Sequence, residues 1–126
     1  MSAPATPDLH QTDLFVSGQG GYHTYRIPAL LVTAAGTMLA FCEGRRYSAS
    51  DSGDIDIVLR RSMDNGETWS EMQLVADAGP DVFGNPCPVQ DRATGMIWLP
   101  INWNLAEGSE SQIVRGAARG VAATER

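Results

Sequence analysis

The residue best suited to bind a ligand by charge is Arg26, at the start of an apolar run in the segment Tyr25-Arg26-Ile27-Pro28. A guanidinium is permanently charged and presents a planar fork that matches a carboxylate, a geometry that lysine cannot supply. The chain holds nine basic residues, and every one is an arginine. From its type and position, Arg26 is either a carboxylate-binding group or an arginine paired at the surface.

An acidic loop follows, in which Asp51, Asp54 and Asp56 stand close together. For Asp54 and Asp56 we expect nothing more than a solvated turn. Asp56 alternates with Ile55 and Ile57, which predicts that its side chain faces away from the core of the protein.

A third motif, Ser62-Met63-Asp64-Asn65-Gly66-Glu67-Thr68-Trp69, has the chemistry of a tight turn between two strands. Asp64 can accept hydrogen bonds from N–H groups of the turn, Gly66 can adopt a positive φ, and Trp69 can pack beneath. A calcium loop needs more oxygen ligands at alternate positions than this segment offers. The two cysteines and two histidines form no zinc pattern. We therefore expect no metal site, and two buried free thiols.

The composition restricts the class of protein. Of the 126 residues 43% are hydrophobic, which is enough for a packed core. A net charge of −6 argues against binding to nucleic acid, which needs a basic surface. No apolar run approaches the roughly 20 residues of a membrane span. The first residues lack a signal-peptide pattern, so the compartment stays unknown: cytoplasmic as given, or exported with the signal missing.

The elements that must position these residues are expected to be short strands. Turn clusters rich in Gly, Asp, Asn and Pro separate them, and no long stretch has a helical period, so the pattern predicts an all-β sandwich, barrel or propeller. Residues 1–13 are expected to be a flexible lead-in to a domain over residues 14–126. The predicted strands are Leu14–Val16, Ile27–Val32, Met38–Cys42, Ile55–Arg61, Thr68–Val75, Val89–Asp91, Met96–Asn102 and Gln112–Gly116.

A weak internal repeat favours the propeller. Residues 27–41 and 86–99 share an outline: a strand that contains proline, a turn that ends near glycine, and an apolar strand. The two outlines are offset by about 58 residues, somewhat longer than the blade repeats of other propellers.

The motif at residues 62–69 matches the S-x-D-x-G-x-T-W pattern of the Asp box, and Tyr25-Arg26-Ile27-Pro28 matches an (F/Y)-R-I-P motif. In this order, with an acidic loop between them, they resemble the exo-α-sialidases (neuraminidases) of the bacterial and animal type. The resemblance covers roughly residues 13–104. It implies a six-bladed β-propeller, of which this chain would hold about two blades, and hydrolysis of terminal sialic acids without a cofactor.

The resemblance also assigns residues. Arg26 matches one of three arginines that hold the sialic acid carboxylate. Asp51 falls where the family has its acid/base aspartate, which must carry a proton to give to the glycosidic oxygen. Because loop lengths vary here, Asp54 is the second candidate for this role. Arg45 and Asn85 match positions near the sugar, although a salt bridge to Glu43 or to the acidic loop is the alternative for Arg45. The Asp box residues Ser62, Asp64, Gly66, Thr68 and Trp69 are expected to be structural.

The family's tyrosine nucleophile, the glutamate that polarises it and the other two arginines find no match in the chain. We therefore expect the N-terminal portion of an enzyme, truncated at its C-terminus and inactive alone. Its unpaired strand edges would favour association. The implied partners are sialylated glycans, namely glycoproteins, gangliosides and oligosaccharides. The alternative is a non-catalytic Asp-box propeller acting as a binding or scaffold module, which would have no need of Arg26 beside an acidic loop.

Overall fold

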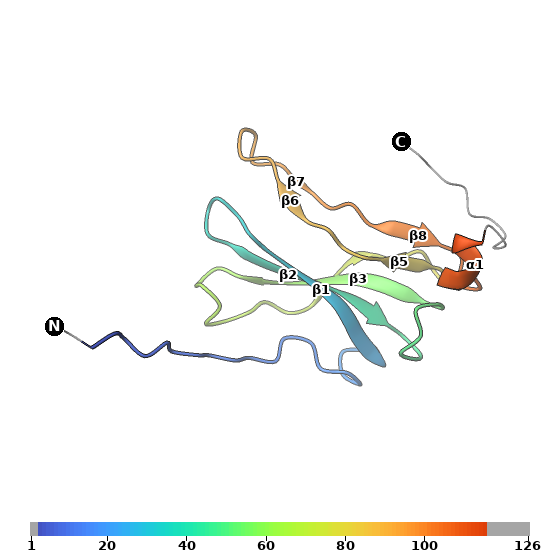
Figure 1. The fold of residues 1–126 in the computed structure, drawn as a ribbon, viewed down its shortest axis with the longest axis horizontal. Helices are drawn as coiled ribbons and strands as arrows, with labels where there is room; N and C mark the ends of the chain where they lie inside the picture. Colours follow the sequence, from blue (N-terminus) through green and yellow to red (C-terminus); the bar gives the residue numbers. More distant parts are fainter. Residues whose placement is uncertain (1–2, 116–126) are drawn as a thin grey trace.

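The computed structural model describes residues 3–115 (Figure 1). Within them the chain forms eight strands and one short helix, so the all-β prediction is confirmed. No helix of this part is both long and apolar enough to cross a lipid bilayer. The elements are β1 (Thr24–Val32), β2 (Met38–Arg45), β3 (Ile55–Ser62), β4 (Gln73–Ala76), β5 (Val82–Gly84), β6 (Val89–Gln90), β7 (Ile97–Trp98), β8 (Asn102–Asn104) and α1 (Glu110–Val114).

The first four strands form an antiparallel meander. β1 pairs along β2, from Thr24 opposite Arg45 to Val32 opposite Met38, and β2 pairs along the whole of β3. β4 pairs with the other edge of β3. The central strands β2 and β3 are mostly buried. Four antiparallel strands in chain order are the content of one propeller blade.

The Asp box makes the turn between β3 and β4. The Asp64 carboxylate accepts hydrogen bonds from the Ser62 hydroxyl at 2.9 Å, from the backbone N–H of Thr68 at 2.8 Å and from the Thr68 hydroxyl. These hydrogen bonds lower the pKa of Asp64, and the bond from the Thr68 hydroxyl has the largest effect. Gly66 has a φ of +89°, and its carbonyl accepts the indole N–H of Trp69 at 3.1 Å. The carboxylate oxygens of Asp64 are therefore occupied by hydrogen bonds within the turn.

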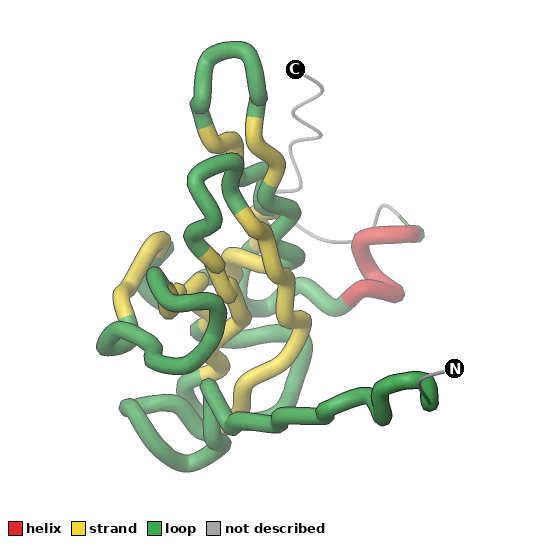
Figure 2. Tube along the Cα trace, turned by 90° about the vertical axis from the view of Figure 1, so that its left-hand side faces the viewer, coloured by secondary structure: helices red, strands yellow, loops and turns green. Residues whose placement is uncertain are grey.

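The strands β5 to β8 form a long, interrupted hairpin. β5 pairs with β8, and β6 pairs with β7 farther along. Between the two pairs the Cys87 N–H donates to the Pro100 carbonyl at 3.1 Å. Figure 2 shows the tip of this hairpin standing beyond the first sheet. One parallel pair, Ile55 with Val82, joins β5 to β3 and so attaches the hairpin to the meander.

Two clusters of apolar side chains lie on opposite faces of the meander, because neighbouring residues of a strand point to opposite sides. Side chains of the β5–β8 hairpin, Phe83 among them, pack on the cluster of Leu39, Phe41 and Ile57. Burial raises the pKa of the Cys42 thiol to about 11. The expectation of two buried thiols is wrong for Cys87, which is exposed in the hairpin. The clusters are Tyr22, Cys42 and Val58 on one face, and Leu39, Phe41 and Ile57 on the other.

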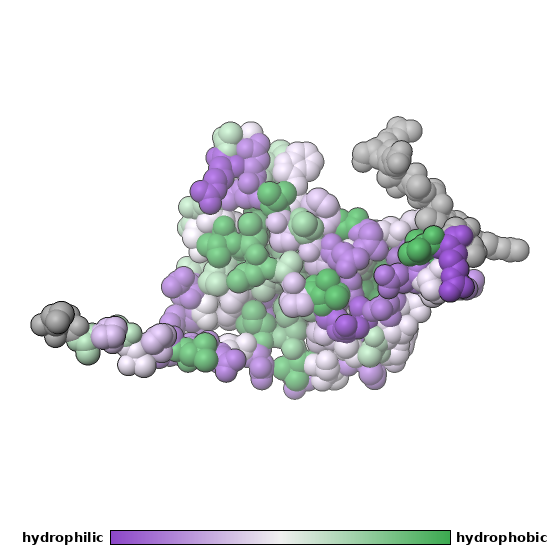
Figure 3. Space-filling model, in the orientation of Figure 1, coloured by the Kyte–Doolittle hydropathy of each residue, from purple (hydrophilic) through white to green (hydrophobic). Residues whose placement is uncertain are grey.

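Apolar side chains also gather at the surface, between the β1–β2 and β6–β7 hairpins (Figure 3). Exposed patches of this kind often mark surfaces that contact other protein. The large apolar residues that are exposed on these strands include Leu30, Val32, Val89, Ile97 and Trp98.

Two predicted strands are wrong. Leu14–Val16 is followed by a glycine-rich turn in which the Gly18 N–H donates to the Tyr22 carbonyl, so this segment forms turns and bends. Gln112–Gly116 was expected to be extended, but residues 112–114 belong to α1, Arg115 is the C-cap of this helix, and Gly116 lies outside the described residues. The helix begins at a capping box, a local signal that the strand prediction overlooked, because Ser109 and Gln112 exchange side-chain to backbone hydrogen bonds.

Two further details of the hairpin differ from the sequence prediction. The expected single strand Met96–Asn102 is split into β7 and β8, since Pro100 has no N–H to continue a ladder. The short strand β5 was not predicted, because three residues are too few for an alternating pattern.

The prediction that Asp56 faces solvent in a turn is also wrong. The side chain of Asp56 is fully buried and accepts a hydrogen bond from the hydroxyl of Tyr22 at 2.8 Å. Arg46 lies 3.1 Å from the same carboxylate oxygen and 5.0 Å from the centre of the Tyr22 ring. Burial, followed by the bond to Asp56, raises the pKa of Tyr22. The hydrogen-bonded pair of Tyr22 and Asp56 is therefore buried, whereas the alternation of Asp56 with Ile55 and Ile57 predicts that this acid is solvated.

Removing the Tyr22 hydroxyl should destabilise the fold. In Tyr22→Phe the buried Asp56 loses a donor, which we expect to lower the free energy of unfolding by about 1–3 kcal/mol. Urea denaturation followed by circular dichroism measures this. The matched control is Tyr47→Phe, at a tyrosine that is 79% exposed, where we expect no change. Equal stability of the two variants would show that the buried hydrogen bond contributes nothing.

Candidate functional site

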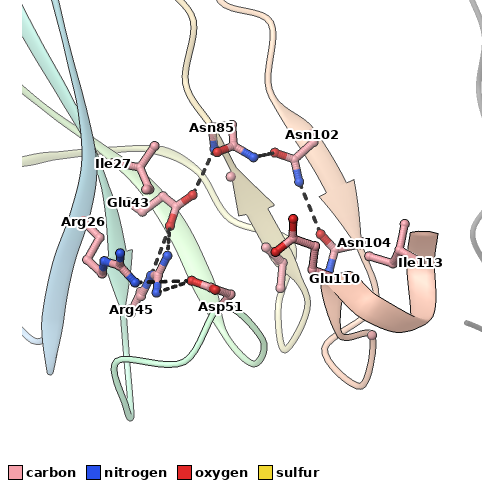
Figure 4. A pocket seen from close by; sticks show the side chains of 13 residues that line it. Arg26, Ile27, Glu43, Arg45, Asp51, Asn85, Asn102, Asn104, Glu110 and Ile113 are labelled. Atoms are coloured by element: carbon pink, nitrogen blue, oxygen red, sulfur yellow. Dashed lines mark hydrogen bonds and ion pairs between the residues drawn. The ribbon is translucent and has the colours of Figure 1, made fainter. Parts of the chain in front are cut away.

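A cleft of about 360 Å³ lies where β1 and β2 approach β5, β8 and α1 (Figure 4). Its volume is in the range of small-molecule sites. All four residues predicted to act on substrate line it, whereas the Asp box residues do not. The residues that line the cleft are Arg26, Ile27, Glu43, Arg45, Asp51, Val82, Gly84, Asn85, Asn102, Asn104, Gly108, Glu110 and Ile113.

A β-bulge turns Arg26 into the cleft. Arg26 pairs with Glu43 and Ala29 pairs with Phe41, so two residues of β1 oppose one of β2. Ile27, inside the bulge, has a φ of +56°, which is a strained conformation for a β-branched residue. Without the extra residue, Ile27 rather than Arg26 would share a face with Ala29 and the core. The bulge therefore lets Arg26 face the cleft on the same side of β1 as Ala29 and Leu31, which pack on the second apolar cluster.

A buried ion pair forms the floor of the site. Arg45 donates from Nε and Nη2 to one oxygen of Glu43, at 3.1 and 2.7 Å. Their side chains are only 3% and 5% exposed. The other Glu43 oxygen accepts the backbone N–H of Asn85 at 3.0 Å. Gly84 permits this approach, since a Cβ there would stand 2.8 Å from the Glu43 carboxylate.

Asp51 is held between the two arginines. Its Oδ1 lies 2.7 Å from Nη1 of Arg45 and 3.5 Å from Nη1 of Arg26 (Figure 4). Arg45 also donates to the Ala49 carbonyl at 2.7 Å, so it fixes the loop as well as the acid. The side chain of Arg26 is 51% exposed and that of Asp51 is 69% exposed. Arg26 and Asp51 are therefore open to a ligand, while the hydrogen bonds of Arg45 are committed to the protein.

Asparagine side chains line the opposite wall. Asn85 has a φ of +51° and donates from its side chain to Asn102 at 2.7 Å, and Asn102 donates to Asn104 at 3.2 Å. Sequence reasoning singled out Asn85 but missed Asn102, Asn104 and the α1 residue Glu110. No local signal identifies these three, because Asn102 and Asn104 reach the cleft through the pairing of β5 with β8, and Glu110 through the position of α1. Glu43 was considered only as a salt-bridge partner, and its burial was not foreseen.

No model of a known protein family matches the chain. Individual relatives do match. The chain is 41% identical to an exo-alpha-sialidase of Arthroderma benhamiae over 83% of its own length and 26% of that relative. It is 37% identical to an exo-alpha-sialidase of Aspergillus fumigatus and 42% identical to a sialidase of Micromonospora viridifaciens, over 85% and 73% of its own length and 26% and 15% of theirs. The chain belongs to the sialidase family.

A solved structure agrees with this sialidase assignment. The fold matches the Hadza microbial sialidase Hz136 with a TM-score of 0.66 at 32% identity, over 73% of this chain and 20% of that one. The match confirms the family prediction, and a partial β-propeller agrees with it. The chain spans about a quarter of the length of the fungal relatives.

In this sialidase chain, Arg45→Leu should be strongly destabilising. The change leaves Glu43 buried without its counter-charge, which we expect to cost about 3–5 kcal/mol of unfolding free energy. Thermal or urea denaturation measures the loss. Arg92→Leu, at an exposed arginine, is the control and should change stability by less than about 0.5 kcal/mol. The double variant Glu43→Leu/Arg45→Leu should recover part of the loss. A single variant as stable as the control would contradict a structural role for the pair.

Proposed function

We propose that this chain supplies the carboxylate-binding and proton-donating part of an exo-α-sialidase, which hydrolyses terminal sialic acids of glycoconjugates. The observation that carries the proposal is the placement of Arg26 beside Asp51 at the open side of one cleft. One sugar can thus contact both groups: Arg26, which can hold its carboxylate, and Asp51, which can protonate a neighbouring oxygen. The names of the relatives support the same activity.

Arg26 is the proposed ligand for the sialic acid carboxylate. Half of its side chain is exposed, and its contact with Asp51 is long, at 3.5 Å. Such an exposed ion pair is worth little, so a substrate carboxylate can replace Asp51 at the guanidinium at low cost. Arg45 keeps its 2.7 Å contact with Asp51 during this exchange. A direct contact of Arg45 with substrate stays a prediction, as does one of Asn85.

Asp51 is the proposed acid/base. It would give its proton to the glycosidic oxygen, so that the bond to the anomeric carbon breaks and the aglycone leaves as an alcohol. The nucleophile implied by the family is a tyrosine. None of the described residues that line the cleft is a tyrosine.

A chimaera tests the roles of Arg26 and Asp51. Residues 14–104 of this chain would replace the matching residues of the Arthroderma benhamiae relative, and hydrolysis of a fluorogenic sialoside would be measured. We expect activity in the chimaera and about a hundredfold loss of kcat/KM in Arg26→Ala, equivalent to about 2.7 kcal/mol. Asp51→Asn should lower kcat by at least about a hundredfold while KM changes little.

Arg92→Ala in the same chimaera is the matched control and should be fully active. Arg26→Lys should remain impaired, because lysine lacks the planar fork. A folded chimaera without activity, or one that is insensitive to Arg26→Ala, would contradict the proposal and favour the non-catalytic binding module.

The 126-residue chain by itself should show little or no turnover of the same sialoside, because the tyrosine, the glutamate and two arginines implied by the family have no match in it. Its exposed apolar patch should make it associate. Activity and size-exclusion chromatography check both statements. Robust turnover by a monodisperse monomer would be the contrary result.

A further inference from the structure

A second group of charged side chains lies outside the cleft, where β3 begins and β4 ends. Asp54, Asp56 and Asp77 each offer a carboxylate oxygen, and these oxygens all lie within 4.8 Å of one another. We propose that this aspartate cluster binds a divalent cation of the Ca²⁺ class. None of the three residues lines the cleft, so the proposed site is separate from the chemistry assigned to Asp51.

Unpartnered oxygens in the cluster point to a missing ligand. Oδ2 of Asp56 is occupied by the Tyr22 hydroxyl at 2.8 Å and by Arg46 at 3.1 Å. Oδ1 of Asp56, in a fully buried side chain, has no hydrogen-bond partner. The shielded Oδ1 of Asp54 accepts no hydrogen bond either, although Nε of Arg46 lies 3.5 Å from it. A buried carboxylate oxygen without a partner is costly, because it has lost its water and gained nothing in return. A cation between the carboxylates would satisfy both atoms.

The charges of the cluster also favour a divalent ion. Arg46 is the cation already present, 3.5 Å from Asp54 and 3.1 Å from Asp56. One guanidinium against three carboxylates leaves two negative charges uncompensated. Burial raises the pKa of both Asp54 and Asp56, and the charge of Asp77 adds to each shift. One divalent cation would bring the group to neutrality.

The donor atoms select the kind of cation. The cluster offers only carboxylate oxygens, which suit hard cations, and lacks the nitrogen or sulfur ligands that zinc prefers. Ca²⁺ accepts an irregular set of oxygens and completes its shell with water, whereas Mg²⁺ requires a near-ideal octahedron. Asp77 is exposed, so water can reach that side. Sequence reasoning expected no metal because it considered only the Asp box segment and the cysteines and histidines, and Asp77 is far along the chain from the other two acids.

A bound cation would join the acidic loop to the β4–β5 turn. Asp54 stands three residues after Asp51, and Asp77 lies in the turn, where its Oδ1 accepts the Gly79 N–H at 2.7 Å. The same region already contains one backbone bond from Ile55 to the Asp81 carbonyl at 3.3 Å. The cation would add a second connection and so restrain the segment that leads to Asp51.

The test is titration calorimetry of the EDTA-treated, desalted 126-residue chain with CaCl₂, together with its thermal unfolding. We expect saturable binding near one ion per chain, tighter for Ca²⁺ than for Mg²⁺. The unfolding midpoint should rise by roughly 10 °C at a hundredfold excess over the dissociation constant. Asp77→Asn should weaken binding at least tenfold and keep the fold, because the residue is exposed.

Asp91→Asn is the matched control, because Asp91 also sits in an exposed turn and accepts a backbone N–H, that of Ala93 at 2.9 Å. It should bind Ca²⁺ as the parent does. Equal affinity in the parent and Asp77→Asn would overturn the proposal. So would a parent that neither binds Ca²⁺ nor gains stability at millimolar Ca²⁺. No readout depends on sialidase activity, so failure here leaves the proposed function untouched.

Discussion

The buried pair of Glu43 and Arg45 is the interaction on which the site depends. The two residues stand two positions apart on β2 and so share a face. Each has a further task, since Glu43 accepts the backbone N–H of Asn85 and Arg45 holds Ala49 and Asp51. A buried charge is tolerable only when every polar atom around it is paired. The requirement to satisfy this pair thus brings the second hairpin and the acidic loop to the two sides of one cleft.

The bulge in β1 places Arg26 and Ala29 on the same face of the strand. A regular strand can give only alternate residues to one face, yet β1 must supply Arg26 to the cleft and Ala29 to the core on the same side. The extra residue corrects the alternation, at the expense of the strained φ of Ile27. Strain of this kind persists where the surrounding structure imposes it, here the ladder to β2 on both sides of the bulge.

The sequence predicted the features that depend on neighbours in the chain. Short apolar runs between turn clusters located most of β1, β2 and β3, and the Asp box gave the turn that follows Ser62. What it could not predict are contacts between distant segments. The alternation with Ile55 predicts that Asp56 faces solvent, but Tyr22 covers its carboxylate. The role of Glu43 depends on Asn85, which is distant in the chain and donates its backbone N–H to the Glu43 carboxylate. Residue types show which groups can pair, whereas the fold decides which of them meet.

The charge of the protein constrains how an anionic sugar could be bound. With a net charge of −6, the chain as a whole repels a carboxylate. At physiological salt, however, exposed charges farther away than about 8 Å are largely screened, so the groups beside Arg26 decide the affinity. Of these, Glu43 is neutralised by Arg45, and Asp51 also keeps Arg45 as its closer partner. Arg45 therefore leaves Arg26 free to bind, and the overall charge should slow encounter more than it weakens the complex.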